Sequence, residues 1–176
     1  MNLWDELEKM RDKQRKQLAS SRAVVRFDEV PWELNKYGKV KWYTHPSIKD
    51  TATRSLMVHV LEIPPGSRSG KIQHQGGTAY YVWAGKGYST INGEKYEWET
   101  DDVLLLPILP EEGVVYQHFN TDLENPARLV GATPNIFDAV GVDLGIGLEV
   151  LENCPEFEAT QKVKKGRFYE RKRSKA

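Results

Sequence analysis

The sequence has few features that would identify a partner or a compartment directly. Its single cysteine, Cys154, excludes an internal disulfide and a cysteine-rich zinc module. This scarcity favours a reducing, cytoplasmic setting, in which a lone thiol without a histidine motif beside it has a structural role. No apolar run approaches the roughly 18 to 20 residues that would span a bilayer. We therefore expect neither a membrane anchor nor an export signal.

Net charge is also absent. Lys and Arg together number 25, as do Asp and Glu, so bulk charge indicates no class of partner. Only residues 162–176 are strongly basic, and basic tails contact phosphates non-specifically. Because the rest of the chain has no DNA-binding motif, we interpret this stretch as a solvated extension and expect no nucleic-acid binding.

The sequence does contain a series of short strands separated by turn residues. Between Pro64 and Asn120, Gly, Pro, Asn or Asp interrupts alternating apolar runs at intervals of roughly eight to twelve residues. Asn92-Gly93 predicts a two-residue hairpin, and the apolar run 103–106 predicts a strand buried on both faces. Residues 127–133 follow as a last core strand. The pattern predicts an all-β protein, an antiparallel β-barrel or sandwich.

A helix is expected before the barrel. Residues 2–20 contain no Gly or Pro and many good helix formers. Leu3, Leu7 and Met10, with Trp4, form a short apolar stripe that would pack on the barrel or on a partner subunit. With 176 residues, one domain is expected. The predicted organisation is a helix over 1–22, a barrel over 23–151 and a basic C-terminal extension over 152–176.

Exposed hydrophobic residues indicate self-association. Trp4, Leu7 and Trp32 lie outside the barrel motifs, and the Gly-punctuated segment 135–151 is apolar. Together they form more hydrophobic surface than a monomer normally leaves uncovered, so we predict a homodimer.

Histidines on the predicted strands are the candidates for chemistry. His74 and His118 lie on separate strands, and inward positions of a small closed barrel converge. His59, on the strand 55–63, is either a core histidine or a third inward imidazole. His45 precedes Pro46 in a predicted loop, and we assign it no role.

Two stretches of the chain, 65–87 and 101–120, resemble the two motifs of the cupin superfamily. The first motif is Gly, five residues, His-x-His, three or four residues, Glu, six residues, Gly. Anchored on Gly85, it places its second histidine on His74, its first on Ile72 and its glutamate on Thr78. The second motif runs through Asp101, Pro107, Gly113, Tyr116 and Asn120, with Tyr116 at the position of the histidine.

Within that superfamily the pattern is similar to that of gentisate 1,2-dioxygenase-like proteins. The similar segments are Tyr81-Val82-Trp83-Ala84-Gly85-Lys86-Gly87 and Tyr116-Gln117-His118-Phe119-Asn120, followed by Asn125-Pro126. The resemblance implies a cupin-type jelly roll. It also implies ferrous iron held by three histidines and dioxygen cleavage of an aromatic ring, although only one of the first motif's three ligands is present.

The resemblance and the residue types give a set of candidate site residues. A catalytic metal with open positions needs about three ligands, and imidazole suits Fe, Zn, Ni or Cu. A divalent metal ion would be held by His74 and His118 with Tyr116 or His59, and Fe(II) is the metal expected if one is bound. The expected acid and base are Tyr116 and His118, and the expected substrate-binding walls are Tyr80, Trp83 and Phe119.

Three functions remain open at this point. The first is a metal-dependent oxygenase acting on a small aromatic or related organic compound. The second is a cupin without metal that isomerises, eliminates or binds a small molecule, with Tyr116 and His118 as acid and base. The third is a sensor or structural subunit whose helix and tail contact a partner.

Overall fold

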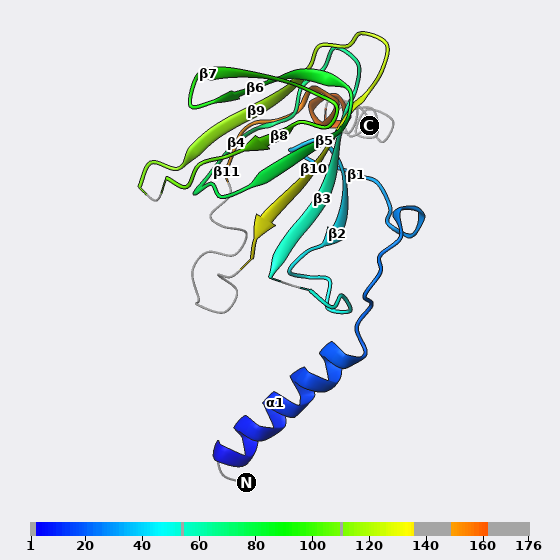
Figure 1. The fold of residues 1–176 in the computed structure, drawn as a ribbon, viewed down its shortest axis with the longest axis vertical. Helices are drawn as coiled ribbons and strands as arrows, with labels where there is room; N and C mark the ends of the chain where they lie inside the picture. Colours follow the sequence, from blue (N-terminus) through cyan, green and yellow to red (C-terminus); the bar gives the residue numbers. More distant parts are fainter. Residues whose placement is uncertain (1–2, 54, 110, 136–148, 162–176) are drawn as a thin grey trace, which may run out of the picture.

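The structure is a computed structural model that describes the chain except residues 1–2, 54, 110, 136–148 and 162–176. Two antiparallel sheets face each other, and a helix precedes them (Figure 1). This arrangement is the predicted all-β jelly roll with an N-terminal helix. The elements include α1 (Leu3–Ala19), the 3-10 helix η1 (Phe27–Glu29), β1 (Glu33–Leu34), β2 (Lys39–Thr44), β3 (Leu56–Ile63), β4 (Lys71–His74), β5 (Ala79–Ala84), β6 (Lys86–Ile91), β7 (Glu94–Glu99), β8 (Val103–Leu105), β9 (Val114–Asn120), β10 (Ala127–Pro134) and β11 (Glu149–Glu152). Residues 155–161, after β11, are helical.

Strand order brings together segments that are distant in the sequence. One sheet has the order β1-β2-β3-β10-β5-β8, and the other has the order β11-β4-β9-β6-β7. The predicted last core strand, β10, lies between β3 and β5 and pairs with both. Every second residue of β10 is buried, as expected for a strand with one face on the core.

The Asn-Gly hairpin forms as predicted. Ile91 pairs with Glu94 across the turn, and the two turn residues Asn92 and Gly93 have φ angles of 49° and 90°. Positive φ at both positions is the requirement of a type I′ turn, whose twist matches that of the flanking strands. The turn therefore fixes the register of β6 against β7.

The prediction that residues 103–106 form a strand buried on both faces is wrong. β8 pairs with β5 at the end of the six-stranded sheet, and only the middle residue, Leu104, is buried among its three. Val103 and Leu105 are 59% and 68% exposed. An apolar run alone predicts burial on both faces, but at the edge of a sheet the outer face of such a run lies in solvent.

The core lies between the sheets. It consists of apolar and tyrosine side chains from both, among them Val40, Leu61, Ile72, Tyr80, Val82, Val114, Tyr116 and Leu129. Cys154 is buried as well, and its thiol donates to the carbonyl oxygen of Asn35 at 3.4 Å. This contact agrees with a structural role for the cysteine.

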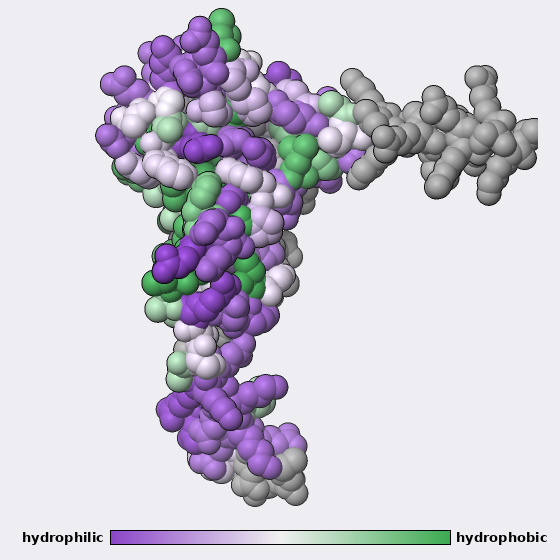
Figure 2. All heavy atoms as spheres, turned by 90° about the vertical axis from the view of Figure 1, so that its right-hand side faces the viewer, coloured by the Kyte–Doolittle hydropathy of each residue, from purple (hydrophilic) through white to green (hydrophobic). Residues whose placement is uncertain are grey.

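α1 extends away from the barrel in Figure 1 and does not cover it. Leu3, Trp4, Leu7 and Met10 are 59–83% exposed, so the expected stripe is present without a neighbour from the described part of the chain. In Figure 2 the visible face of α1 is largely hydrophilic, whereas hydrophobic side chains surface on the barrel. No helix in the described ranges is long and apolar enough to cross a membrane.

Two predicted segments fall largely outside the described residues. Of the apolar segment 135–151, residues 136–148 are not described, and its end belongs to β11 at the edge of the five-stranded sheet. The basic stretch 162–176 also lies outside the described residues.

Candidate functional site in the barrel interior

His118 lies at the centre of the barrel. It belongs to β9, is fully buried, and is paired in register with Ser89 of β6. Its Nδ1 atom lies 2.6 Å from Ser89 Oγ, and the same oxygen accepts a hydrogen bond from Trp98 Nε1 at 2.9 Å. This chain of contacts fixes the ring orientation. The other nitrogen, Nε2, is buried and has no hydrogen-bond partner among the described residues.

His59 faces the same interior from the opposite sheet. It lies on β3, and its cross-strand neighbours are Trp42 of β2 and Gly131 of β10. A Cβ atom at position 131 would lie only 2.4 Å from His59 Cε1, so glycine is needed for the imidazole to fit. Within the described chain, both nitrogens of His59 are buried without a hydrogen-bond partner.

Three tyrosines form a chain of hydroxyl groups beside the two histidines. The hydroxyl of Tyr80 lies 2.8 Å from that of Tyr37 and 3.0 Å from that of Tyr116. The Tyr80 ring centre is 4.6 Å from that of His118 and 6.0 Å from that of His59. The interior therefore combines hydroxyl donors with imidazoles that have unused hydrogen-bonding capacity.

His74 occupies a different part of the barrel. The pairing of β4 with β9 places His74 opposite Val114, at the start of β9, whereas His118 lies near the end of β9. Tyr116 lies between the two imidazoles, with ring centres 5.2 Å from His74 and 5.3 Å from His118. His74 Nδ1 also accepts a hydrogen bond from the Gly76 amide at 2.7 Å. The imidazole that faces Tyr80 together with His118 is thus His59.

Trp83 and Phe119 do not line the interior, which corrects their expected place beside Tyr80. Side chains alternate along a strand, and Val82 and His118 point inward, so their neighbours Trp83 and Phe119 point outward. Trp83 is 41% exposed and packs edge-to-face on Phe27, while Phe119 stacks on Tyr88 at 4.6 Å between ring centres.

Burial keeps the interior groups electrically neutral. Desolvation lowers the pKa of His59 to about 4 and, together with repulsion from His59, lowers the pKa of His118 to about 3. Desolvation also raises the pKa of Tyr116 well above its ordinary value. It raises the pKa of Tyr80 to about 12, and the hydrogen bonds from Tyr37 and Tyr116 oppose that rise. Near neutral pH the site therefore presents neutral imidazoles and neutral phenols.

The sequence of the barrel matches a known protein family. Residues 59–132, which run from β3 to β10, match the family described as "Cupin domain". Over these residues the chain is similar to cupin domains. Both histidines of the interior pair lie within this range. A comparison with curated proteins finds no match.

Several solved structures share the fold of this chain. A predicted oxalate decarboxylase from Thermotoga maritima is 23% identical with a TM-score of 0.50, covering 62% of this chain and 96% of that one. An uncharacterized protein with a double-stranded β-helix domain from Klebsiella pneumoniae is 16% identical with a TM-score of 0.53. The match covers 76% of this chain and 100% of that one. The coconut allergen cocosin is 16% identical with a TM-score of 0.55. The match covers 69% of this chain and 34% of that one. At these identities the likeness establishes the fold alone.

The cupin motif positions do not fit a metal ion in this chain. Ile72 is a fully buried core residue, Thr78 Oγ1 lies 2.9 Å from Thr133 Oγ1, and Tyr116 belongs to the hydroxyl chain. Among the described residues there is no group of three His, Cys, Asp or Glu side chains that could hold a metal. His59 and His118 offer bare nitrogens, but the described part of the chain places no carboxylate with them, and a doubly charged ion buried with neutral ligands would be costly.

Three residues of the site were not anticipated from the sequence. Ser89 could have been found, because the Asn-Gly turn fixes β6 and its alternation points Ser89 inward. Tyr37 lies in the turn between β1 and β2, where its amide is held by Asn35 Oδ1 at 2.9 Å. No periodic pattern covers that turn. The sequence marks Gly131 only as a glycine within a predicted strand, which does not indicate that it lies beside His59.

Proposed function

We propose that this chain is a cupin that binds a small, neutral organic molecule in the barrel interior without a metal ion, as a binding protein, isomerase or lyase. The observation that supports it is the set of unpartnered nitrogens on His59 and His118. A buried polar atom without a partner costs about 1–3 kcal/mol, and a ligand that hydrogen-bonds to these atoms recovers that energy. Neutral phenols and imidazoles favour a neutral ligand, because they offer no countercharge.

Proton transfer is compatible with the same arrangement. The raised pKa of Tyr116 keeps it protonated, as an acid requires, and the lowered pKa of His118 keeps it unprotonated, as a base requires. A pKa of about 3 makes His118 a weak base near neutral pH. Ligand binding is therefore the primary proposal, and turnover requires a substrate with an acidic proton.

A metal-dependent dioxygenase, as in gentisate 1,2-dioxygenase-like cupins, is the second candidate. The same bare nitrogens favour it, because unprotonated imidazole is a ligand for Fe(II). His59 and His118 would provide two ligands. Tyr116 or Tyr80 would have to lose its proton against its raised pKa before a phenolate could provide the third ligand and the missing negative charge. Bound iron would supply the activation of dioxygen.

Binding of neutral probes separates the two candidates. We expect phenol or catechol to give saturation-transfer NMR signals with EDTA-treated wild-type protein. The signals should be lost in His59→Asn and His118→Asn and kept in the matched outward variant Phe119→Leu. Equal signals in all variants would contradict the interior site. Stoichiometric metal in untagged protein, lost in both histidine variants, would favour the dioxygenase.

We also propose that α1 pairs with α1 of a second copy, which makes the protein a homodimer. The exposed stripe of Leu3, Trp4, Leu7 and Met10 supports this proposal. The sequence of α1 is acidic in its first half, with Asp5, Glu6 and Glu8, and mainly basic in its second half. In an antiparallel pair these halves would face each other with opposite charge.

A further inference from the structure

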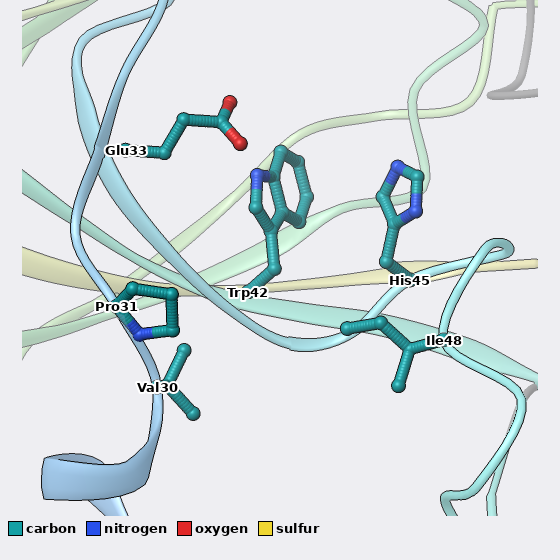
Figure 3. Close-up of a pocket in the computed structure, with 6 residues that line it drawn as sticks. All are labelled: Val30, Pro31, Glu33, Trp42, His45 and Ile48. Carbon is teal, nitrogen blue, oxygen red and sulfur yellow. The ribbon is translucent and has the colours of Figure 1, made fainter.

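A pocket lies at the edge of the six-stranded sheet, outside the residues that match the cupin family. Its volume is about 350 Å³, and it is lined by Val30, Pro31, Glu33, Trp42, His45 and Ile48. These residues belong to β1, β2 and the segments beside them. In Figure 3 Glu33, Trp42 and His45 lie side by side, with Val30, Pro31 and Ile48 below them. The volume falls within the range of small-molecule sites.

Trp42 forms the rigid part of this pocket. Its ring centre lies 5.2 Å from that of His45 and 5.0 Å from that of His59. The buried imidazole of His59 packs against the indole and holds it in place. Trp42 is only half-buried, so part of its surface is available to a ligand.

Glu33 gives the pocket its charge. It is the only acidic or permanently basic side chain among the lining residues, and in Figure 3 its carboxylate extends toward the Trp42 indole. One carboxylate oxygen accepts a hydrogen bond from Asn35 Nδ2 at 2.6 Å. The described residues provide no cationic partner for it, since the nearby Lys39 is paired with Glu62 at 2.6 Å.

We propose that this pocket binds a small organic cation, an aryl- or alkylammonium compound. The ammonium group would lie between the Glu33 carboxylate and the Trp42 indole, where charge attraction and the electron-rich ring both favour a cation. The apolar part would cover Val30, Pro31 and Ile48. An anion would meet the carboxylate without any lysine or arginine in the lining to offset it.

The site is independent of the function proposed for the interior. It uses residues 30–48, whereas the interior site uses His59, His118 and the hydroxyl chain. A failure of either proposal leaves the other standing, because their probes and variants differ.

Titration calorimetry with three probes that share a phenyl ring tests the proposal. Benzylammonium should bind wild-type protein, and benzyl alcohol should bind at least about threefold more weakly, as expected for one solvent-exposed charge pair. Benzoate should bind least. Glu33→Gln keeps the shape and an oxygen for Asn35, and it should weaken benzylammonium about three- to fivefold. Glu94→Gln, an exposed carboxylate in the other sheet, is the matched control and should leave the affinity unchanged.

Indole NMR signals locate the ligand. The Trp42 Nε1–H signal, assigned by its loss in Trp42→Phe, should move on addition of benzylammonium, while that of Trp98 on β7 should not. Equal affinity for benzyl alcohol, an unchanged affinity in Glu33→Gln, or an unmoved Trp42 signal would overturn the proposal. Wild-type-like binding by His118→Asn would show that the interior site is not involved.

Discussion

Mild acid is expected to destabilise the fold, because three buried histidines resist protonation. Burial lowers the pKa of His59 and His74 to about 4 and that of His118 to about 3. In the unfolded chain a histidine has a pKa of about 6.5. A folded pKa below the unfolded one means that the unfolded state binds protons first as the pH falls. Stability is therefore complete above about pH 6.5 and is lost between about pH 6.5 and pH 4.

The size of the effect follows from these values. Between about pH 7 and pH 5, protonation of one such histidine in the unfolded chain costs the folded state about 2 kcal/mol. For His59, His74 and His118 together the loss is about 6 kcal/mol, against a total stability of about 5–15 kcal/mol for a typical domain. Carboxyls such as that of Glu152, whose pKa the Arg68 hydrogen bond lowers, lose their contribution at lower pH. The chosen window therefore isolates the histidines.

Urea unfolding of EDTA-treated protein at several pH values measures this loss. In His118→Asn the loss between about pH 7 and pH 5 should fall by about one third, even if the variant is less stable throughout. Phe119→Leu, on the outward face next to it, should keep the full pH dependence. A stability that stays constant over this range, or a His118→Asn variant with an unchanged slope, would refute the assignment of these rings as neutral and buried.

Three further predictions concern packing and assembly. Gly131→Ala should cost about 3 kcal/mol in urea unfolding, because its Cβ would overlap His59 Cε1 at 2.4 Å; a loss below about 1 kcal/mol would contradict this packing. Tyr80→Phe removes the central hydroxyl of the chain and should cost about 1–3 kcal/mol, whereas Tyr96→Phe, at a 48% exposed position, should cost almost nothing; equal costs would argue against the hydroxyl chain. Leu7→Lys with Met10→Lys should convert a sedimenting dimer to a monomer while the barrel stays folded, and a wild-type monomer at micromolar concentration would refute pairing through α1.

The fold could be predicted from the sequence where local signals and tertiary position agree. Alternation defined β3 and β9, and the Asn-Gly turn defined the β6–β7 hairpin. The error at β8 has a physical origin, since an apolar run is the same in a central strand and at an edge. Which strands lie at an edge depends on pairing between distant segments, and the order β5-β8 is not encoded locally.

Side-chain direction was the second limit. Tyr80 and Trp83 are both aromatic and close in sequence, but their positions differ by an odd number of residues along β5, so they face opposite sides of the sheet. The same rule separates His118 from Phe119 on β9. Applying alternation strictly would have excluded Trp83 and Phe119 from the interior. Tyr37 could not have been included, because a turn has no periodicity that indicates its direction.

The motif positions also show why a ligand pattern alone misplaces the chemistry. Where cupin metal ligands would be, Ile72 fills the core, Thr78 bonds to Thr133, and Tyr116 joins the hydroxyl chain. Each of these side chains satisfies its own surroundings and leaves nothing for a ligand to complete. The unsatisfied nitrogens lie instead on His59 and His118, at positions that the motif does not specify. Because an unsatisfied buried group is costly to keep, these two imidazoles are where a bound molecule gains most, and the interior site is best defined by them.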